Sequence, residues 1–235
     1  MVERFLEQTR FTSEEDYRQH LHFRIPENFN FAYDVMDAWA EEQPDKLAII
    51  WTNDQGAERR TTFAQLKKET DQTASYLQSL GIGRGDMVML ILKRRYEWWL
   101  TMLALHKLGA IAIPATHMLT SKDIVYRNNS ASVKAVICVD DDYVISQIKQ
   151  ALPDSPTLKT IVIVGEDADY SKYSDFSENS DLLHYWQKEW QQTPPFPRPG
   201  HVNGNDDTML LYFTSGTSGE PKMVAHNCLY AHGHL

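Results

Sequence analysis

Apolar and polar positions follow a helical period most clearly in one long stretch of the chain, residues 63–80. Apolar side chains recur there every three or four residues, a spacing that places them on one face of an α-helix. Thr62 and Gln65 have the spacing of a capping box at its start, and Gly81 is suited to end it. The pattern therefore predicts an amphipathic helix that buries one face.

Short continuous apolar runs alternate with helical stretches between residues 87 and 164. Such runs are typical of strands that are covered on both faces of a sheet. Strands are expected at residues 87–92, 111–114, 135–139 and 160–164, and helices at residues 96–108, 121–129 and 142–152. Alternation of this kind indicates βαβ units. The predicted fold is α/β, a mostly parallel sheet with helices on both faces.

The segments before this region are shorter. A helix is expected at residues 31–42, and a hairpin is expected to join residues 47–51 to residues 59–62 through the turn residues 53–56. Residues 1–30 contain apolar side chains without a sustained period, which predicts an arm that packs onto the body. Its expected anchors are Phe5, Phe11, Phe23, Ile25 and Phe29.

The segments after this region are more polar. Residues 165–180 are acidic and lack a period, so we expect a mobile surface loop. A short helix is predicted at residues 182–191, with Leu183, Trp186 and Trp190 facing inward. Residues 193–200 contain four prolines and predict a semi-rigid linker. The expected divisions are an arm at 1–30, an α/β subdomain at 31–192, a Pro-rich linker at 193–206 and a phosphate-binding strand and loop at 207–235, which continues the same domain.

Composition narrows the classes of partner. The chain has 235 residues, 42% of them hydrophobic and 23% charged, as expected for a soluble globular protein. A formal net charge of −9 argues against nucleic acid or an acidic membrane as a partner. The two cysteines show no metal or redox spacing, and no apolar run is long enough to span a bilayer. The first residues are too acidic for a transit peptide and lack a secretion signal, so we expect a cytosolic protein.

A polar loop follows the apolar run at residues 209–213, which predicts a strand that delivers the loop. Glycines let the backbone turn its N–H groups toward an anion, while hydroxyls add donors and a lysine can reach a β- or γ-phosphate. The candidate ligands of a polyphosphate are Thr214, Ser215, Gly216, Thr217, Ser218, Gly219 and Lys222. The spacing is not that of a Walker loop or of a dinucleotide fingerprint, and the alternative is a Ser/Gly-rich surface turn.

Residues 212–224 resemble the phosphate-binding signature of the adenylate-forming superfamily, which includes acyl-CoA synthetases and peptide-synthetase adenylation domains. Within that superfamily the chain is most similar to the medium-chain acyl-CoA synthetases. The supporting segments are residues 29–32, 97–99, 109–114, 123–127 and 222–223, which occur in the family's order. The mammalian members that the chain resembles are mitochondrial.

The resemblance implies a reaction with ATP, Mg²⁺ and coenzyme A. A carboxylate attacks the α-phosphate of ATP to give an acyl-adenylate and pyrophosphate, and the thiol of coenzyme A then displaces AMP. It also implies that the seven loop residues hold the β- and γ-phosphates, and that Thr214 or its neighbours approach the metal. No residue of this chain is assigned as catalytic, and no protein metal ligand is predicted.

The family's adenine and ribose segments, its hinge and its catalytic lysine have no match in the 235 residues. We therefore expect the N-terminal portion of a synthetase, a truncated part of the domain that does not complete the reaction alone. The alternatives are a non-catalytic nucleotide-binding or interaction module, or an adenylating enzyme with a different acyl acceptor. Fatty and aromatic acids are favoured as substrates only by similarity, and the sequence does not indicate an oligomeric state.

Four other groups of residues have two interpretations each. Trp98 and Trp99 suit a stacking platform or an acyl-chain wall, but the leucines of their helix favour core and interface packing. Lys93, Arg94 and Arg95 follow a predicted strand, where a phosphate of coenzyme A could bind, although a solvated surface is favoured. The histidines His226, His232 and His234 suggest a metal site, but no Cys, Asp or Glu accompanies them at ligand spacing, so metal binding is disfavoured. Cys228 lies close to His226 and could be a thiol nucleophile, but nothing orients the pair and a packed cysteine is favoured.

Overall fold

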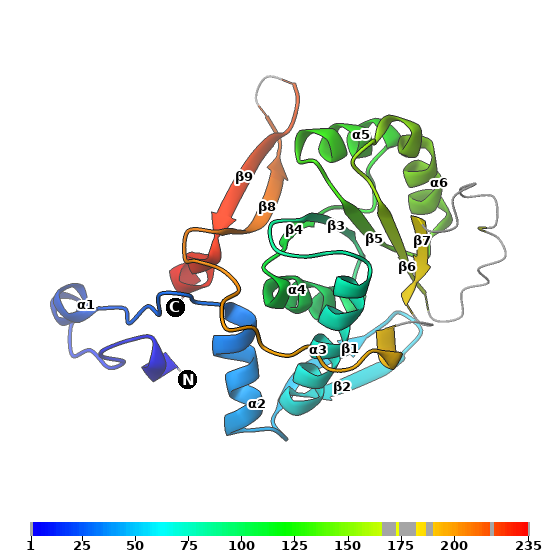
Figure 1. Cartoon of the computed structure of the whole chain (residues 1–235). Helices are drawn as coiled ribbons and strands as arrows, with labels where there is room; N and C mark the ends of the chain where they lie inside the picture. Colours follow the sequence, from blue (N-terminus) through cyan, green and yellow to red (C-terminus); the bar gives the residue numbers. More distant parts are fainter. Residues whose placement is uncertain (1, 166–172, 174–181, 187–189, 217–218, 235) are drawn as a thin grey trace.

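The computed structural model describes residues 2–165, 173, 182–186, 190–216 and 219–234, and Figure 1 shows how their elements are arranged. The main sheet contains the strands β3 (Met87–Ile91), β4 (Ile111–Pro114), β5 (Ala135–Val139), β6 (Thr160–Val164), β7 (Leu183–Tyr185), β8 (Thr208–Thr214) and β9 (Lys222–Asn227). Their order is β7-β6-β5-β3-β4-β8-β9, and only the pair of β8 and β9 is antiparallel. The predicted mostly parallel sheet is confirmed.

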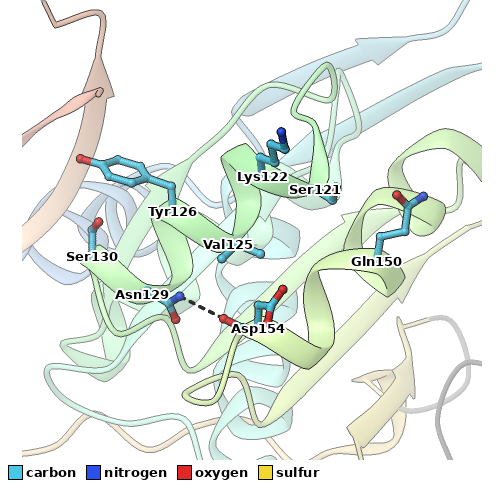
Figure 2. A pocket seen from close by; sticks show the side chains of 8 residues that line it. All are labelled: Ser121, Lys122, Val125, Tyr126, Asn129, Ser130, Gln150 and Asp154. Carbon is cyan, nitrogen blue, oxygen red and sulfur yellow. Dashed lines mark hydrogen bonds between the residues drawn. The ribbon is translucent and has the colours of Figure 1, made fainter. Parts of the chain in front are cut away.

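One face of the sheet is covered by α5 (Ser121–Ser130) and α6 (Asp142–Ala151), which contact each other. Met89 and Ile91 of β3 are buried on this face. The side-chain amide of Asn129 donates a hydrogen bond to the carbonyl oxygen of Asp154 at 2.9 Å (Figure 2), which ties the end of α5 to η3 (Leu152–Asp154), the turn after α6.

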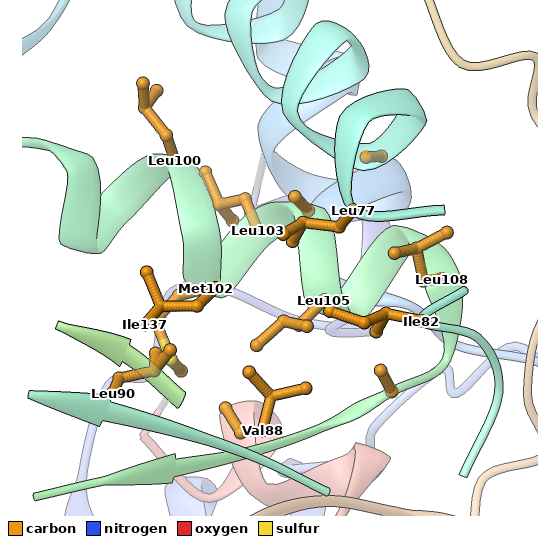
Figure 3. Packing of buried hydrophobic residues seen from close by; sticks show 14 of the residues in the cluster. Leu77, Ile82, Val88, Leu90, Leu100, Met102, Leu103, Leu105, Leu108 and Ile137 are labelled. Carbon is orange, nitrogen blue, oxygen red and sulfur yellow. The ribbon is translucent and has the colours of Figure 1, made fainter. Parts of the chain in front are cut away.

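The opposite face is covered by α3 (Phe63–Ser79) and α4 (Glu97–Leu108). Figure 3 shows Leu105 of α4 directed at Val88 of β3. Val88 and Leu90 belong to this core whereas their neighbours in β3 belong to the other, because successive side chains of a strand point to opposite faces. The prediction of helices on both faces is confirmed.

The predicted ends of these helices are also confirmed. Thr62 and Gln65 form both hydrogen bonds of the capping box at the start of α3. Gly109 ends α4 in the left-handed conformation with φ 67°, which a residue without a Cβ adopts readily.

The hairpin and the first long helix lie beside the α3 and α4 layer. β1 (Leu47–Thr52) and β2 (Glu58–Thr62) pair in antiparallel fashion, as predicted. The predicted helix at residues 31–42 is present, but its first part is the π-helical segment η2 (Ala32–Asp37), followed by α2 (Ala38–Glu42).

A buried ion cluster joins η2, α3 and α4. The ammonium group of Lys107 lies 2.9 Å from a carboxylate oxygen of Asp37 and 2.6 Å from one of Asp71. Lys67 approaches the same two carboxylates, at 3.5 and 2.8 Å. Lys107 is only 1% exposed, so its charge is neutralised by the two aspartates rather than by solvent.

Residues 183–185 form strand β7 instead of the start of the predicted helix, and that prediction is wrong. They pair in parallel with Ile161–Ile163, so the edge of the sheet satisfies their main-chain groups. Trp186 and Trp190 are buried as expected, but Leu183 is only half-buried. Residues 187–189, and most of the loop expected at residues 165–180, lie outside the described residues.

The N-terminal arm includes η1 (Val2–Arg4) and α1 (Glu14–His20), and Figure 1 shows α1 well away from the sheet. Phe5 and Phe29 are buried as expected, and their ring centroids lie 5.6 Å apart. Phe11 is half-buried, and Phe23 and Ile25 are exposed, so the arm is anchored by fewer side chains than predicted.

The Pro-rich segment passes along η2 and α3. The backbone N–H of Phe196 donates to the carbonyl oxygen of Asp71 at 3.1 Å, and Arg198 forms an ion pair with Asp34 at 3.0 Å. The division into an arm, a subdomain, a linker and a final segment remains a prediction. Among the described residues, no helix has the length and apolar character needed to cross a bilayer.

Candidate functional site: the loop between β8 and β9

The candidate phosphate loop connects the two strands of the β8 and β9 hairpin. β8 lies parallel to β4, so the loop begins at the carboxyl end of a parallel strand, where ligands bind in open α/β sheets. Thr214 is paired with Lys222 across the base of the loop, which brings the first and last predicted ligands together. Ser215 is exposed beside them. The predicted ligands Thr217 and Ser218 are not among the described residues.

Two predicted glycines have backbone positions that restrict a side chain. A Cβ atom on Gly216 would lie 2.4 Å from the carbonyl oxygen of Glu220, a distance that real Cβ atoms do not show. Gly219 has φ 114°, a conformation that residues with a side chain rarely adopt. The loop therefore depends on glycine at both positions.

Lys222 supplies the positive charge at this loop. Its side chain is exposed, and no carboxylate of the described residues forms an ion pair with it. An ammonium group in this position is available to an anion from solvent. Together with the hydroxyl groups of Thr214 and Ser215, it makes a site that can hold phosphate oxygens without a covalent step by the protein.

The basic residues after β3 are engaged mainly with the protein. Lys93 forms an ion pair with Asp141 at 2.6 Å, and Arg95 donates two hydrogen bonds to the buried carboxylate of Glu97, at 2.9 and 2.8 Å. Arg94 is exposed, and its carbonyl oxygen accepts a hydrogen bond from the indole of Trp51. Lys93 and Arg95 therefore fix the loop after β3, and Lys93 and Arg94, which are exposed, fit the solvated surface that the sequence favours.

Two of the C-terminal histidines lie in aromatic clusters. His226 of β9 packs against the rings of Tyr212 and Tyr230, with centroids 5.6 and 4.2 Å away. His232, in η7 (Cys228–His234), is buried against Phe5 and Phe29. No group of three metal-ligating side chains is found in the part of the chain that the structure describes.

Cys228 is buried, and burial raises the pKa of its thiol to about 11. A thiol with that pKa is almost entirely protonated at neutral pH and is a poor nucleophile. The prediction of a packed cysteine is confirmed.

Trp98 and Trp99 line an apolar cavity of about 830 Å³ on the α4 side of the sheet. Trp98 is half-buried against the core, as expected, but Trp99 is 49% exposed. Trp99 is therefore not part of the core, because no element among the described residues covers that side of α4, and its packing at an interface stays a prediction. Other lining residues come from β1, β8 and η7 and include Ile49, Met209, Tyr212 and Tyr230.

His106 lies on the same helix and also lines the cavity. Its side chain is buried, and neither ring nitrogen has a hydrogen-bond partner among the described residues. Burial disfavours the charged imidazolium and lowers the pKa of His106 from 6.5 to about 4. The sequence does not indicate that His106 is buried, because a single polar residue in a helix can equally well face solvent.

We expect His106 to make folding stability fall with acidification. The folded pKa is below that of the unfolded chain, so the unfolded state binds the proton first and stability decreases as the pH falls from 6.5 to about 4. The decrease should be about 3 kcal/mol. His106→Leu should remove it when urea unfolding is compared at pH 7 and pH 4.5.

His117→Gln is the matched control, because His117 is exposed. This control retains His106 and should keep the full pH dependence of the wild type. Burial also lowers the pKa of His232, so a smaller acid sensitivity should persist in His106→Leu. An equal pH dependence in His106→Leu and the wild type would contradict the assignment.

Both a family model and individual relatives of known sequence match this chain. A family model described as "AMP-binding enzyme" matches residues 36–232. The chain is 36% identical over 216 residues to acyl-coenzyme A synthetase ACSM5, mitochondrial, of Rattus norvegicus, a match that covers 89% of this chain and 35% of the relative. It is 32% identical over 209 residues to the mitochondrial ACSM4 of Homo sapiens, covering 86% of this chain and 34% of the relative.

A solved structure of the anthranilate CoA ligase AuaEII in complex with anthranoyl-AMP has the same fold. The TM-score is 0.71 at 24% sequence identity, and the match covers 87% of this chain and 36% of that one. The chain thus spans about a third of the length of the curated relatives that it matches.

Proposed function

The chain belongs to the family of AMP-binding enzymes, and from that membership we propose that it is the N-terminal part of an acyl-CoA synthetase. In the proposed reaction an oxygen of a carboxylic acid attacks the α-phosphorus of ATP, and the bond to pyrophosphate breaks. The thiol sulfur of coenzyme A then attacks the acyl carbonyl, and AMP leaves. The observation that carries the proposal is the β8 and β9 loop at the end of a parallel strand, with its glycines and with Lys222, which forms no ion pair with the described residues.

The proposed part of this chain in the reaction is to hold the β- and γ-phosphates. Backbone N–H groups near Gly216 and Gly219 and the hydroxyl groups of Thr214, Ser215, Thr217 and Ser218 would donate hydrogen bonds. Lys222 would neutralise part of the charge on the departing pyrophosphate. This role is electrostatic, since it stabilises charge that moves onto the phosphate oxygens.

We also propose that the nucleotide arrives with Mg²⁺. A magnesium ion bound to phosphate keeps several waters and needs few protein oxygens, which fits a site with hydroxyl groups and no carboxylate cluster among the described residues. Thr214 is exposed at the loop base and is the proposed contact of this ion. The metal would supply additional neutralisation of phosphate charge.

We expect the 235-residue chain to bind inorganic pyrophosphate in the presence of Mg²⁺, and Lys222→Ala to weaken that binding by about tenfold or more. Titration calorimetry measures both affinities. Lys68→Ala is the control, because Lys68 is exposed on α3, outside the loop. Equal affinities for Lys222→Ala and Lys68→Ala would contradict the proposed role of Lys222.

The full reaction is proposed to need sequence beyond this third of the relatives' length. Incubation of the chain with ATP, a fatty or aromatic acid and coenzyme A should therefore yield no acyl-CoA, and detection of acyl-CoA would contradict this. An acyl acceptor other than coenzyme A would leave the adenylate step unchanged. The proposed partners are small molecules rather than nucleic acid, as the net charge of −9 suggests. The proposed location is the cytosol, although the names of the relatives carry the word mitochondrial.

A further inference from the structure

Helix α5 contacts the base of the phosphate loop directly. The hydroxyl of Tyr126 donates a hydrogen bond to the carbonyl oxygen of Pro221, 2.8 Å away. Figure 2 shows the Tyr126 side chain extending from α5 toward the β8 and β9 hairpin. Pro221 directly precedes Lys222. Because proline has no N–H group, its carbonyl oxygen is the only main-chain atom of Pro221 that can form a hydrogen bond with α5.

The same turn of α5 also holds the strand that enters the loop. The ring of Tyr126 meets the ring of Phe213 edge to face, with centroids 6.1 Å apart. The guanidinium carbon of Arg127 lies 5.1 Å from the Phe213 ring centroid. Phe213 and Pro221 stand on opposite sides of the loop, so α5 contacts both of its ends.

The pairing of β8 with its parallel neighbour ends before the loop. The register of β8 with β4 consists of the pair Ala112 and Leu210, which is four residues before Thr214. Beyond Leu210 the hairpin extends past the pairing with β4, as Figure 1 shows for β8 and β9. Among the described residues, the contacts with α5 thus lie closer to the loop than the pairing with β4 does.

We propose that Tyr126 is a positioning residue for polyphosphate binding. Its hydroxyl fixes the Pro221 carbonyl, and thereby the direction of the Lys222 side chain and of the neighbouring backbone N–H groups. Donors that are already oriented lose no energy to reorganisation when the anion binds. This inference rests on the proposed function of the loop, and Tyr126 itself does not contact phosphate.

The test compares Tyr126→Phe, which deletes only the hydroxyl and keeps the ring on Phe213, with the wild-type chain. Tyr143→Phe on α6 is the matched control, because Tyr143 is exposed. Two measurements are made on each protein: the affinity for inorganic pyrophosphate with Mg²⁺, and the rate of trypsin cleavage after Lys222. Cleavage after Arg18, on the distant α1, is the internal reference in the same digests.

Tyr126→Phe is expected to speed cleavage after Lys222 and to weaken pyrophosphate binding, each by about fivefold, while cleavage after Arg18 and both properties of Tyr143→Phe stay unchanged. Faster cleavage with unchanged affinity would overturn the proposal, because the bond would then serve only the fold of the loop. No change in either measurement would overturn it too. Failure of the wild-type chain to bind pyrophosphate would instead refute the function of the loop, and the positioning role with it.

Discussion

Lys107→Met is expected to lower the free energy of unfolding by about 3–5 kcal/mol, the largest effect on stability that we predict. The ammonium group of Lys107 lies within 2.9 Å of carboxylates of both Asp37 and Asp71, and all three side chains are buried. Methionine fills similar space but leaves two carboxylates with one fewer positive charge. Burial raises the pKa of Asp37 even with Lys107 present, so further loss of charge compensation should be costly.

Urea unfolding followed by tryptophan fluorescence measures this loss. Lys122→Met is the control, since Lys122 is exposed on α5, and it should change stability by less than about 0.5 kcal/mol. Adding Asp37→Asn and Asp71→Asn to Lys107→Met should recover part of the stability, because neutral amides are less costly to bury than unpaired carboxylates. A loss below about 1 kcal/mol for Lys107→Met would show that Lys67 alone compensates the two aspartates.

Gly216→Ala is expected to reduce pyrophosphate affinity by about tenfold or more, as large an effect on binding as that expected for Lys222→Ala. The added Cβ would lie 2.4 Å from the Glu220 carbonyl oxygen, and this neighbour is main chain rather than a flexible side chain. The main chain around Gly216 must therefore move, which would displace the N–H groups that are proposed to donate to phosphate. Calorimetric titration with pyrophosphate and Mg²⁺ measures the loss.

Gly83→Ala is the matched control, because a Cβ at Gly83 meets no atom within 4 Å. It should bind pyrophosphate like the wild type. Gly216→Ala should melt within a few degrees of the wild type, since the change lies in a loop outside both cores. Wild-type affinity in Gly216→Ala would contradict the assignment of this loop as a preformed phosphate site.

The fold could be predicted largely from sequence because its signals are local. Continuous apolar runs at residues 87–92 and 135–139 indicate strands covered on both faces, and the capping residues around 63–80 mark a helix within a few positions. The position of the candidate loop is local as well, because it follows its own strand directly. The loop's function remains a proposal, supported by the family match and by the restricted position of Gly216.

The features that the sequence did not predict depend on distant residues. Tyr126 and Pro221 are 95 residues apart, and neither carries a pattern that indicates the other. Lys107 and Asp37 lie in different helices, and the position of a charged residue along a helix does not show whether it pairs inside the core or faces solvent. The spacing of Leu183, Trp186 and Trp190 is typical of a helix, but pairing with β6 at the edge of the sheet determines the conformation of residues 183–185.

Among the described residues, β9 is the strand at one edge of the sheet, and residues 222–225 within it are exposed. An outer strand of this kind can pair with the edge of another molecule, and a lysine there opposes such pairing because two copies bring like charges together. We therefore expect Lys222 to oppose self-association at this edge, in addition to its proposed role with phosphate. A variant that removes its charge is expected to self-associate more readily through this edge, so its loss of pyrophosphate binding should be compared with its sedimentation behaviour.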